Sequence, residues 1–135
     1  VGALALTAPD AADPDSVDAE ARERMRAVVR AVTEYHREDP GLHAVLTERR
    51  HADPELDRLT SEAEAQLVRS IAGLLERWQV GGDVEATAFV LFGTVEGAVH
   101  AHVLGQPMVS DERFFDALVE VLVRSALPSR ERTSP

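Results

Sequence analysis

The segment covering residues 84–104 restricts the possible folds more than any other part of this sequence. When it is drawn as a helix with about 100° between successive residues, apolar side chains cover nearly the whole circumference. The only polar interruptions are Glu85, Thr87, Thr94, Glu96, His100 and His102. A helix that is apolar all round lies in the middle of a larger structure. A chain of 135 residues is too small to cover it on every side, so we expect a second copy of the chain.

The rest of the chain also favours helices. Between residues 15 and 127 apolar residues recur at spacings of three and four, and no segment alternates for long enough to be a strand. We expect helices to begin near Asp15 or Ser16, after Asp39-Pro40, after Asp53-Pro54, at Val84 and after Ser110, because these residues supply caps and first-turn prolines. Gly81-Gly82 is expected to close the long third helix, near Gln79. The predicted fold class is therefore all-α, a bundle of five helices.

The composition of the chain and the length of its apolar runs exclude several classes of protein. The chain has 24 acidic residues against 14 basic ones and no cysteine, which disfavours tight binding to nucleic acid and excludes thiolate chemistry. The longest nearly apolar run, residues 86–95, is half of the ~20 residues that a membrane span needs, so we expect a cytoplasmic protein without membrane contact. We expect residues 1–14 to form a linker or the end of a connecting helix, and residues 128–135 a flexible tail.

The sequence gives no positive sign of catalysis. It contains no Gly-x-Ser-x-Gly elbow, no glycine-rich phosphate loop and no His-Glu-x-x-His motif. We therefore predict that the chain is not an enzyme and has no cofactor or metal. An enzyme that uses Glu96 as a base with His100 as its partner is a third-ranked alternative.

Three small residues stand four apart on one face of the apolar helix: Gly93, Gly97 and Ala101, with Leu104 beside them. Each glycine costs a helix about 1 kcal/mol relative to alanine, so two glycines in one helix need a reason. Close approach of a helix from a second chain is the interpretation that we favour. Packing within the chain and a kink near a ligand are the alternatives.

Glu96 and His100 share another face of this helix, next to Phe89 and Phe92. A carboxylate among aromatic rings pays desolvation unless it is paired, so one interpretation is a Glu96–His100 ion pair or a bond to a neighbouring helix. A second is a polar anchor in a mostly apolar small-molecule pocket. A third, a metal site, would need His36, His43 or Glu34 to converge on the pair, and His102 lies about 200° from His100 and cannot join it.

We predict that the pocket is lined from three helices, although plain core positions are the alternative for several of its members. The predicted ligand-binding residues are Met25, Val29, Tyr35, Ile71, Trp78, Phe89, Phe92, Glu96 and His100. His36 and Leu74 are further candidates for the walls of the same cavity.

The order of elements resembles the C-terminal regulatory domain of the TetR family of bacterial transcriptional repressors. The strongest local match is Phe89-Val-Leu-Phe-Gly-Thr-Val-Glu-Gly-Ala-Val-His100, followed by Phe114-Phe115-Asp-Ala-Leu-Val-Glu-Val-Leu-Val, and the resemblance covers residues 15–127. It implies that the last two helices of each chain form a four-helix dimer interface. The implied interface residues are Gly93, Gly97, Ala101, Leu104, Phe115, Leu118, Val119 and Leu122.

The resemblance also implies a function. The helices before the last two would enclose an effector pocket, and a bound small molecule would alter the affinity of the full-length repressor for DNA. Nothing before Asp15 resembles the helix-turn-helix module of the family, so we expect DNA contact only through a module that this sequence lacks. The alternative is a standalone helical homodimer that acts as a structural or protein-binding module.

Overall fold

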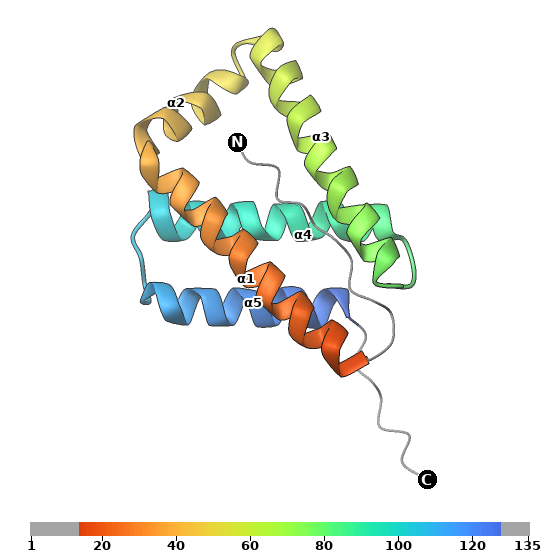
Figure 1. The fold of residues 1–135 in the computed structure, drawn as a ribbon. Helices are drawn as coiled ribbons and strands as arrows, with labels where there is room; N and C mark the ends of the chain where they lie inside the picture. The colour runs from red at the N-terminus through yellow and green to blue at the C-terminus, as the bar shows by residue number, and fades with distance from the viewer. Residues whose placement is uncertain (1–13, 128–135) are drawn as a thin grey trace.

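The computed structural model describes residues 14–127, which form five α-helices and one short π-helix (Figure 1). The elements are α1 (Pro14–Glu38), α2 (Pro40–Arg50), α3 (Pro54–Arg77), α4 (Val84–Val99), η1 (His100–Leu104) and α5 (Asp111–Ala126). The described residues contain no strand, so the all-α prediction is confirmed. Most of the predicted linker and the whole predicted tail lie outside the described residues, and Pro14 belongs to α1.

Most helix starts follow the capping residues that the sequence predicted. The Asp39 carboxylate accepts a hydrogen bond from the Leu42 amide, and a proline follows Asp39 at the first helical position of α2. Asp53 and Ser110 cap α3 and α5 in the same way. Each cap satisfies amide donors that have no partner inside the helix. Helix α1 differs, because it begins at Pro14 and includes the expected cap residues Asp15 and Ser16 in its first turn.

The end of α3 differs from the prediction. The helix stops at Arg77, and Gln79 adopts the left-handed conformation with φ of 57°. The Val80 amide then donates to the Leu75 carbonyl oxygen at 3.0 Å, and the Gln79 amide donates to the Glu76 oxygen at 3.0 Å. This pair of bonds is the Schellman arrangement, which usually needs glycine at the left-handed position. Gly81-Gly82 therefore follows the helix end and does not form it.

The apolar fourth helix changes its winding before it ends. After Val99 the chain continues as the π-helical turn η1, and the Gly105 amide donates to the His100 carbonyl oxygen at 3.2 Å. A Cβ atom on Gly105 would lie 2.7 Å from the Ala101 carbonyl oxygen, closer than real Cβ contacts come. Glycine is thus required where the wide turn closes. The sequence did not predict this turn, which carries both His100 and His102.

The core lies where α1 crosses α4 and α5, and α3 leans against α4 from the other end (Figure 1). Helix α1 contributes Ala21 and Val29, both fully buried. The C-terminal end of α3 contributes Leu75 and Trp78, while α5 contributes most of its apolar face. Burial of these side chains provides the main driving force for folding.

Helix α2 and the first part of α3 stand away from this core. Helix α2 buries none of its residues, and several large apolar side chains remain exposed there: Leu42, Val45, Leu46, Leu59 and Leu67. The apolar stripe expected along the third helix is therefore buried only near its C-terminal end. Isolated exposed apolar residues are common, but a group of them on neighbouring helices is typical of a surface that binds something.

By length and composition, the combined helix Val84–Leu104 could cross a membrane, contrary to the estimate from residues 86–95. Only 22% of its most apolar window is buried inside the chain. A helix of a soluble protein that is covered by neighbouring protein has the same length and composition, so this property alone is weak evidence.

Candidate functional site

One face of α4 and of η1, which continues it, presents four of the residues that the sequence assigned to a ligand pocket. Phe89, Phe92, Glu96 and His100 follow one another at spacings of three and four, and the two rings border a groove between α3 and α4. The volume of this groove is about 640 Å³. The Phe89 side chain is largely bare, with 67% of its surface exposed.

The groove combines an aromatic wall with a charged rim. Its apolar surface comes mainly from Phe89, Phe92 and Val68, and charged groups of both helices stand around it. The complete lining is Ser61, Glu64, Ala65, Val68, Arg69, Asp83, Glu85, Ala86, Phe89 and Phe92. Glu64 is held in place by the Arg50 guanidinium, with N–O distances of 2.7 and 3.0 Å. Three acids and one arginine leave the rim with a net negative formal charge.

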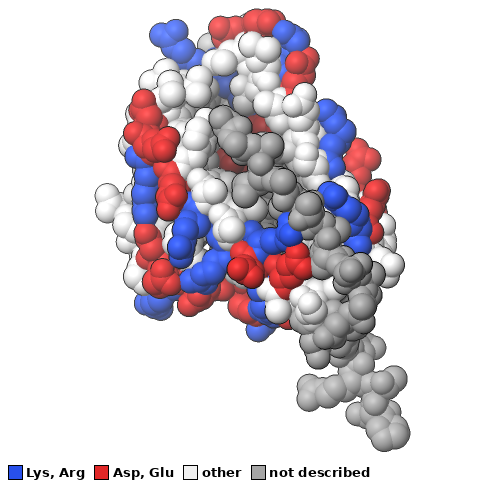
Figure 2. All heavy atoms as spheres, in the orientation of Figure 1, with Lys and Arg blue, Asp and Glu red and all other residues white. Residues whose placement is uncertain are grey.

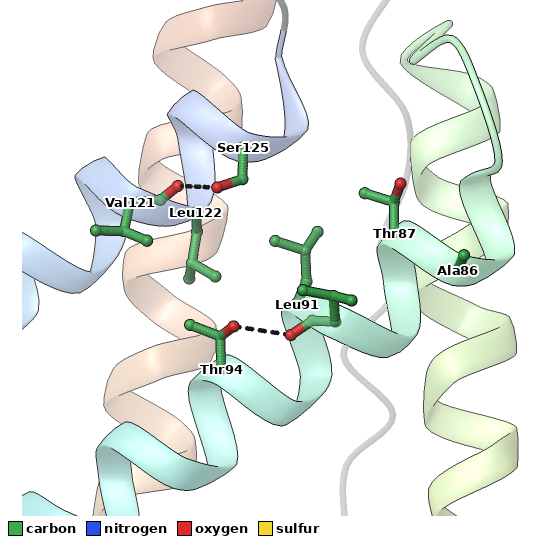
Figure 3. A pocket seen from close by; sticks show the side chains of 8 residues that line it. Ala86, Thr87, Leu91, Thr94, Val121, Leu122 and Ser125 are labelled. Atoms are coloured by element: carbon green, nitrogen blue, oxygen red, sulfur yellow. Dashed lines mark hydrogen bonds between the residues drawn. The ribbon is translucent and has the colours of Figure 1, made fainter.

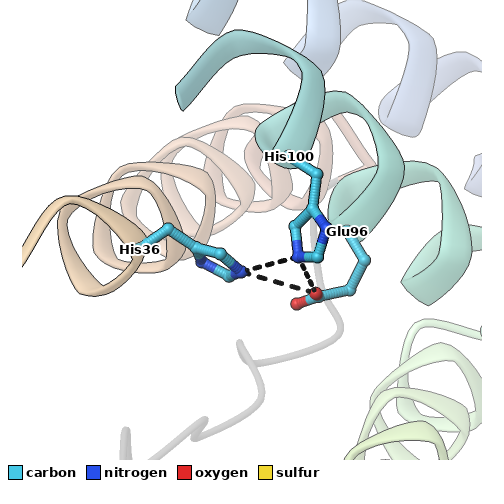
Figure 4. A group of neighbouring side chains, drawn as sticks. All are labelled: His36, Glu96 and His100. Atoms are coloured by element: carbon cyan, nitrogen blue, oxygen red, sulfur yellow. Dashed lines mark hydrogen bonds and ion pairs between the residues drawn. The ribbon is translucent and has the colours of Figure 1, made fainter. Parts of the chain in front are cut away.

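At the other end of the same face, Glu96 and His100 meet His36 from α1 (Figure 4). His100 Nε2 lies 3.0 Å from His36 Nε2, and Glu96 Oε2 lies 3.3 Å from His100 Nε2 and 3.6 Å from His36 Nε2. The His36 side chain is buried, whereas Glu96 and His100 are each about one-third exposed. The structure thus brings together the predicted pair Glu96 and His100 with His36, which precedes them by sixty or more positions in the sequence.

The His36 ring is fixed on its far side. Its Nδ1 atom lies 2.8 Å from the Val32 carbonyl oxygen, which can only accept, so Nδ1 donates this hydrogen bond. His43 stacks on the same ring with a centroid distance of 4.3 Å, and Tyr35 meets His43 edge-on. The cluster therefore points an oriented imidazole at Glu96 and His100.

A second surface of α4 meets α5 around a shallow hollow of about 320 Å³ (Figure 3). Val90 and Val121 face it and are 62% and 51% exposed. The hydroxyls of Thr94 and Ser125 donate to carbonyl oxygens of their own helices, at 2.8 and 2.7 Å. Because these hydroxyls already have partners, an apolar surface could cover the hollow without leaving buried donors unsatisfied.

The small residues Gly93 and Gly97 of α4 and Ala101 of η1 are exposed. A Cβ atom on either glycine would meet no atom of residues 14–127 within 4 Å, so packing among these residues does not explain the two glycines. Leu104 is partly buried. The four α5 residues predicted for the dimer interface, Phe115, Leu118, Val119 and Leu122, are at most 6% exposed and belong to the core of their own chain. Of these, Leu122 also lines the α4–α5 hollow.

The remaining predicted ligand-binding residues do not line the groove. Val29 and Trp78 are core residues, and Met25 and Ile71 pack against the core. Tyr35 is 60% exposed and touches His43. The predicted ligand-binding residues did not include the α3 residues that line the groove, and His36 was only a further candidate for its walls. The sequence did name His36 as a candidate third member of a metal site, but nothing in its spacing indicated which residue would converge.

Charged side chains of α1 form ion pairs with acidic side chains of α5. Arg37 contacts Asp111 through two bonds of 2.6 and 2.7 Å, Arg26 pairs with Glu112, and Arg22 pairs with Glu120. The Arg37 bonds and the His102 bond hold the pKa of the Asp111 carboxyl well below its usual range. Figure 2 shows acidic and basic groups side by side on the visible face, without a continuous basic patch that would suit a phosphate backbone.

These features define an all-helical domain with an open aromatic groove and an uncovered apolar helix face. A family model described as "Tetracyclin repressor-like, C-terminal domain" matches residues 21–124, and the chain belongs to this family. Domains of this family are regulatory, generally dimerise and bind small-molecule effectors, and are generally not enzymes. No curated protein and no solved structure gave a match.

Proposed function

We propose that this chain is the effector-sensing and dimerisation part of a TetR-type transcriptional repressor. A small molecule in the α3–α4 groove would change the affinity of the whole protein for DNA, and a DNA-binding module outside this sequence would make the contacts to DNA. The observation that carries the proposal is that α4 remains uncovered on two sides. One side borders the groove, and the other presents two glycines whose Cβ positions have no neighbour within 4 Å in the described part of the chain.

The character of the groove favours one class of effector. Its volume of about 640 Å³ falls within the range of small-molecule sites, which is about 300–1,000 Å³. Phe89 and Phe92 offer flat apolar contact, and the acids Glu64, Asp83 and Glu85 outnumber Arg69 at the rim. A planar apolar molecule that carries a positive charge fits this combination, because aromatic faces and carboxylates both attract cations.

The dimer face follows from the other side of α4. Exposed Val90, Gly93 and Gly97 form a low surface on which a second helix can approach closely, and Val121 extends this surface onto α5. A second copy of the chain is the proposed partner. An effector that binds one arrangement of α3 and α4 better than another would then change how the two chains meet, within the limit of its differential affinity.

The dimer half of the proposal can be tested with Gly97→Leu. The added side chain should block close helix approach, so sedimentation equilibrium should report a monomer or a much weaker dimer. Gly73→Leu is the matched control, since a Cβ atom on this α3 glycine also meets nothing within 4 Å. An unchanged dimer mass for Gly97→Leu, or equal weakening by both variants, would contradict this dimer face.

The effector half can be tested with a panel of planar hydrophobic cations, scored by thermal stability and by the fluorescence of the single tryptophan, Trp78. For any ligand found, Phe89→Ala should weaken binding at least 10-fold, which corresponds to about 1.4 kcal/mol. Tyr35→Ala is the control, because its ring is similarly exposed but lies outside the groove.

The alternative, a standalone helical homodimer, shares the dimer face and differs only at the groove. It is favoured by the same exposed small residues on α4. A dimer whose groove binds no member of the panel would support this alternative and contradict the sensor.

A further inference from the structure

Three metal-ligating side chains meet at the junction of α1 with α4 and η1. They are His36, Glu96 and His100, whose ligand atoms all lie within 4.8 Å of one another. Figure 4 shows the two imidazole Nε2 atoms and one Glu96 oxygen directed at a common point. The function proposed above does not depend on this cluster, because the groove is lined by other residues.

The separations of the three atoms match the ligand spacing of a small metal ion. The edges of the triangle are 3.0, 3.3 and 3.6 Å. Zinc binds His nitrogens and carboxylate oxygens at about 2.0–2.2 Å in tetrahedral geometry. Simple geometry then puts two ligand atoms about 3.3 Å apart, which is the middle of the observed range. The three atoms therefore occupy one face of a tetrahedron.

The same distances describe a poor hydrogen-bonded network. Good N–H···O bonds are about 2.7–3.2 Å long, and both contacts of the Glu96 oxygen exceed this range. The short contact of 3.0 Å joins two imidazole nitrogens and needs one donor and one acceptor. His36 Nδ1 donates to the Val32 carbonyl oxygen, so in the neutral ring Nε2 is an acceptor or a ligand. His100 Nε2 would then donate to His36 and has no second proton for Glu96. The interpretation of Glu96 as a partner of His100 or of a neighbouring helix fits both carboxylate contacts, and the metal interpretation adds a reason for the convergence of all three side chains.

The surroundings of His36 are those of a supported ligand. Metal-binding histidines usually donate their second ring N–H to a carbonyl or carboxylate, which orients the ring and raises its basicity. Val32 supplies that carbonyl here, and the stacked His43 ring restricts rotation of His36. Glu96 and His100 are partly exposed, so a fourth ligand can approach from solvent.

We propose that His36, Glu96 and His100 bind one divalent transition-metal ion of the zinc class, with a fourth position open to water or to a donor atom of a ligand. Two imidazoles and a carboxylate are a donor set that suits Zn²⁺ and its neighbours in the first row. Because His36 belongs to α1 and the other two residues to α4 and η1, the ion would link the two helices that cross at the core. Metal loading would thereby stabilise this crossing.

The test uses the tag-free chain titrated with Zn²⁺ by calorimetry, and with Co²⁺ as a spectroscopic substitute. The wild type should bind one ion per chain, show the intense visible absorption of tetrahedral Co²⁺ and unfold at a higher temperature with Zn²⁺. Glu96→Gln and His100→Gln should each weaken binding at least about 100-fold, more than the loss of an outer partner usually costs. Both side chains are partly exposed, so circular dichroism should report an intact helical fold.

His51→Gln is the control, since His51 is an exposed imidazole outside the cluster. His36→Gln should behave like His100→Gln, but its side chain is buried and its folding must be checked first. The site would be refuted if wild type showed no saturable binding of either ion, or if Glu96→Gln and His100→Gln bound as tightly as His51→Gln. A negative result here leaves the Phe89 and Gly97 tests of the proposed function unaffected.

Discussion

Replacement of Asp111 by alanine should lower the free energy of unfolding more than the same replacement of any other acidic residue on α5. Asp111 is the first residue of α5, and its carboxylate receives two bonds from Arg37 of α1 and one of 2.8 Å from His102 of η1. The His102 ring also stacks on Phe114, at a centroid distance of 4.1 Å. One carboxylate therefore holds three elements together at the end of the bundle.

The expected loss can be estimated from these contacts. Arg37 and Asp111 are each about 40% exposed, so water screens their ion pair and it contributes about 0.5–1 kcal/mol. His102 is only 5% exposed, and a buried donor without its acceptor costs about 1–3 kcal/mol. Loss of a negative charge at a helix N-terminus adds about 0.3–1 kcal/mol. Because these terms overlap, we expect a total of about 2–3 kcal/mol, or about 8–12 °C in the thermal midpoint.

The measurement is urea unfolding at fixed protein concentration, followed by circular dichroism. Glu112→Ala is the matched control, because Glu112 lies in the same first turn, is 71% exposed and pairs only with Arg26. It should cost less than about 1 kcal/mol. Equal destabilisation by the two variants would refute the reasoning, since the buried His102 contact would then contribute nothing.

The same contacts predict a pH dependence. Arg37 first, and then His102, lower the pKa of Asp111 from its ordinary value of 3.8, while Glu34 acts on Arg37 from the same helix. A lowered pKa in the folded state means that the ionised carboxylate stabilises the fold above about pH 4 and loses this effect as the pH falls further. The stability difference between wild type and Asp111→Asn should therefore shrink as the pH falls below about 4. A constant difference down to pH 2.5 would contradict this assignment.

Two backbone predictions concern single residues. Gln79→Gly should raise the free energy of unfolding by about 0.5–1 kcal/mol. It removes left-handed backbone strain of about 1–2 kcal/mol, and the larger conformational entropy of glycine in the unfolded chain offsets part of this gain. An unchanged thermal midpoint would contradict this. Gly105→Ala should lower it by about 1–3 kcal/mol, because the new Cβ would meet the Ala101 carbonyl oxygen at 2.7 Å. A neutral result in thermal unfolding would mean that the η1 turn opens at little cost.

Helix starts could be predicted because their causes are local. Asp39, Asp53 and Ser110 each bond to an amide two or three residues ahead, so the sequence contains both partners. The end of α3 could not be predicted in the same way. Gln79 tolerates a left-handed conformation only because the bonds of Val80 and of its own amide offset the strain. The π-turn at His100 has no sequence signal that distinguishes it from a continued α-helix.

Helical periodicity predicts which residues share a face of one helix, but it does not predict contacts between helices. The spacing of Phe89, Phe92, Glu96 and His100 is enough to put them on one face, whatever surrounds the helix. That His36 completes the polar cluster depends on how α1 crosses α4, which helical periodicity does not encode. Likewise, the apolar stripe of α5 identifies Phe115 and Leu118 as buried, but periodicity cannot say whether their own chain or a partner covers them.

The composition of residues 84–104 is better explained by protein neighbours than by lipid. Lipid surrounds a spanning helix on every side. It would therefore enclose Glu96 and His100 as well as Val90 and Gly97, and burial of the charged carboxylate would cost several kcal/mol. Protein neighbours can place different side chains against each face of the helix. Here α1 meets Glu96 and His100 with a third polar group, and Leu91 belongs to the core. A Cβ atom on Gly97 would meet nothing within 4 Å among the residues that the structure describes. Under the proposed function, this helix would contact an effector with one face and a partner chain with another.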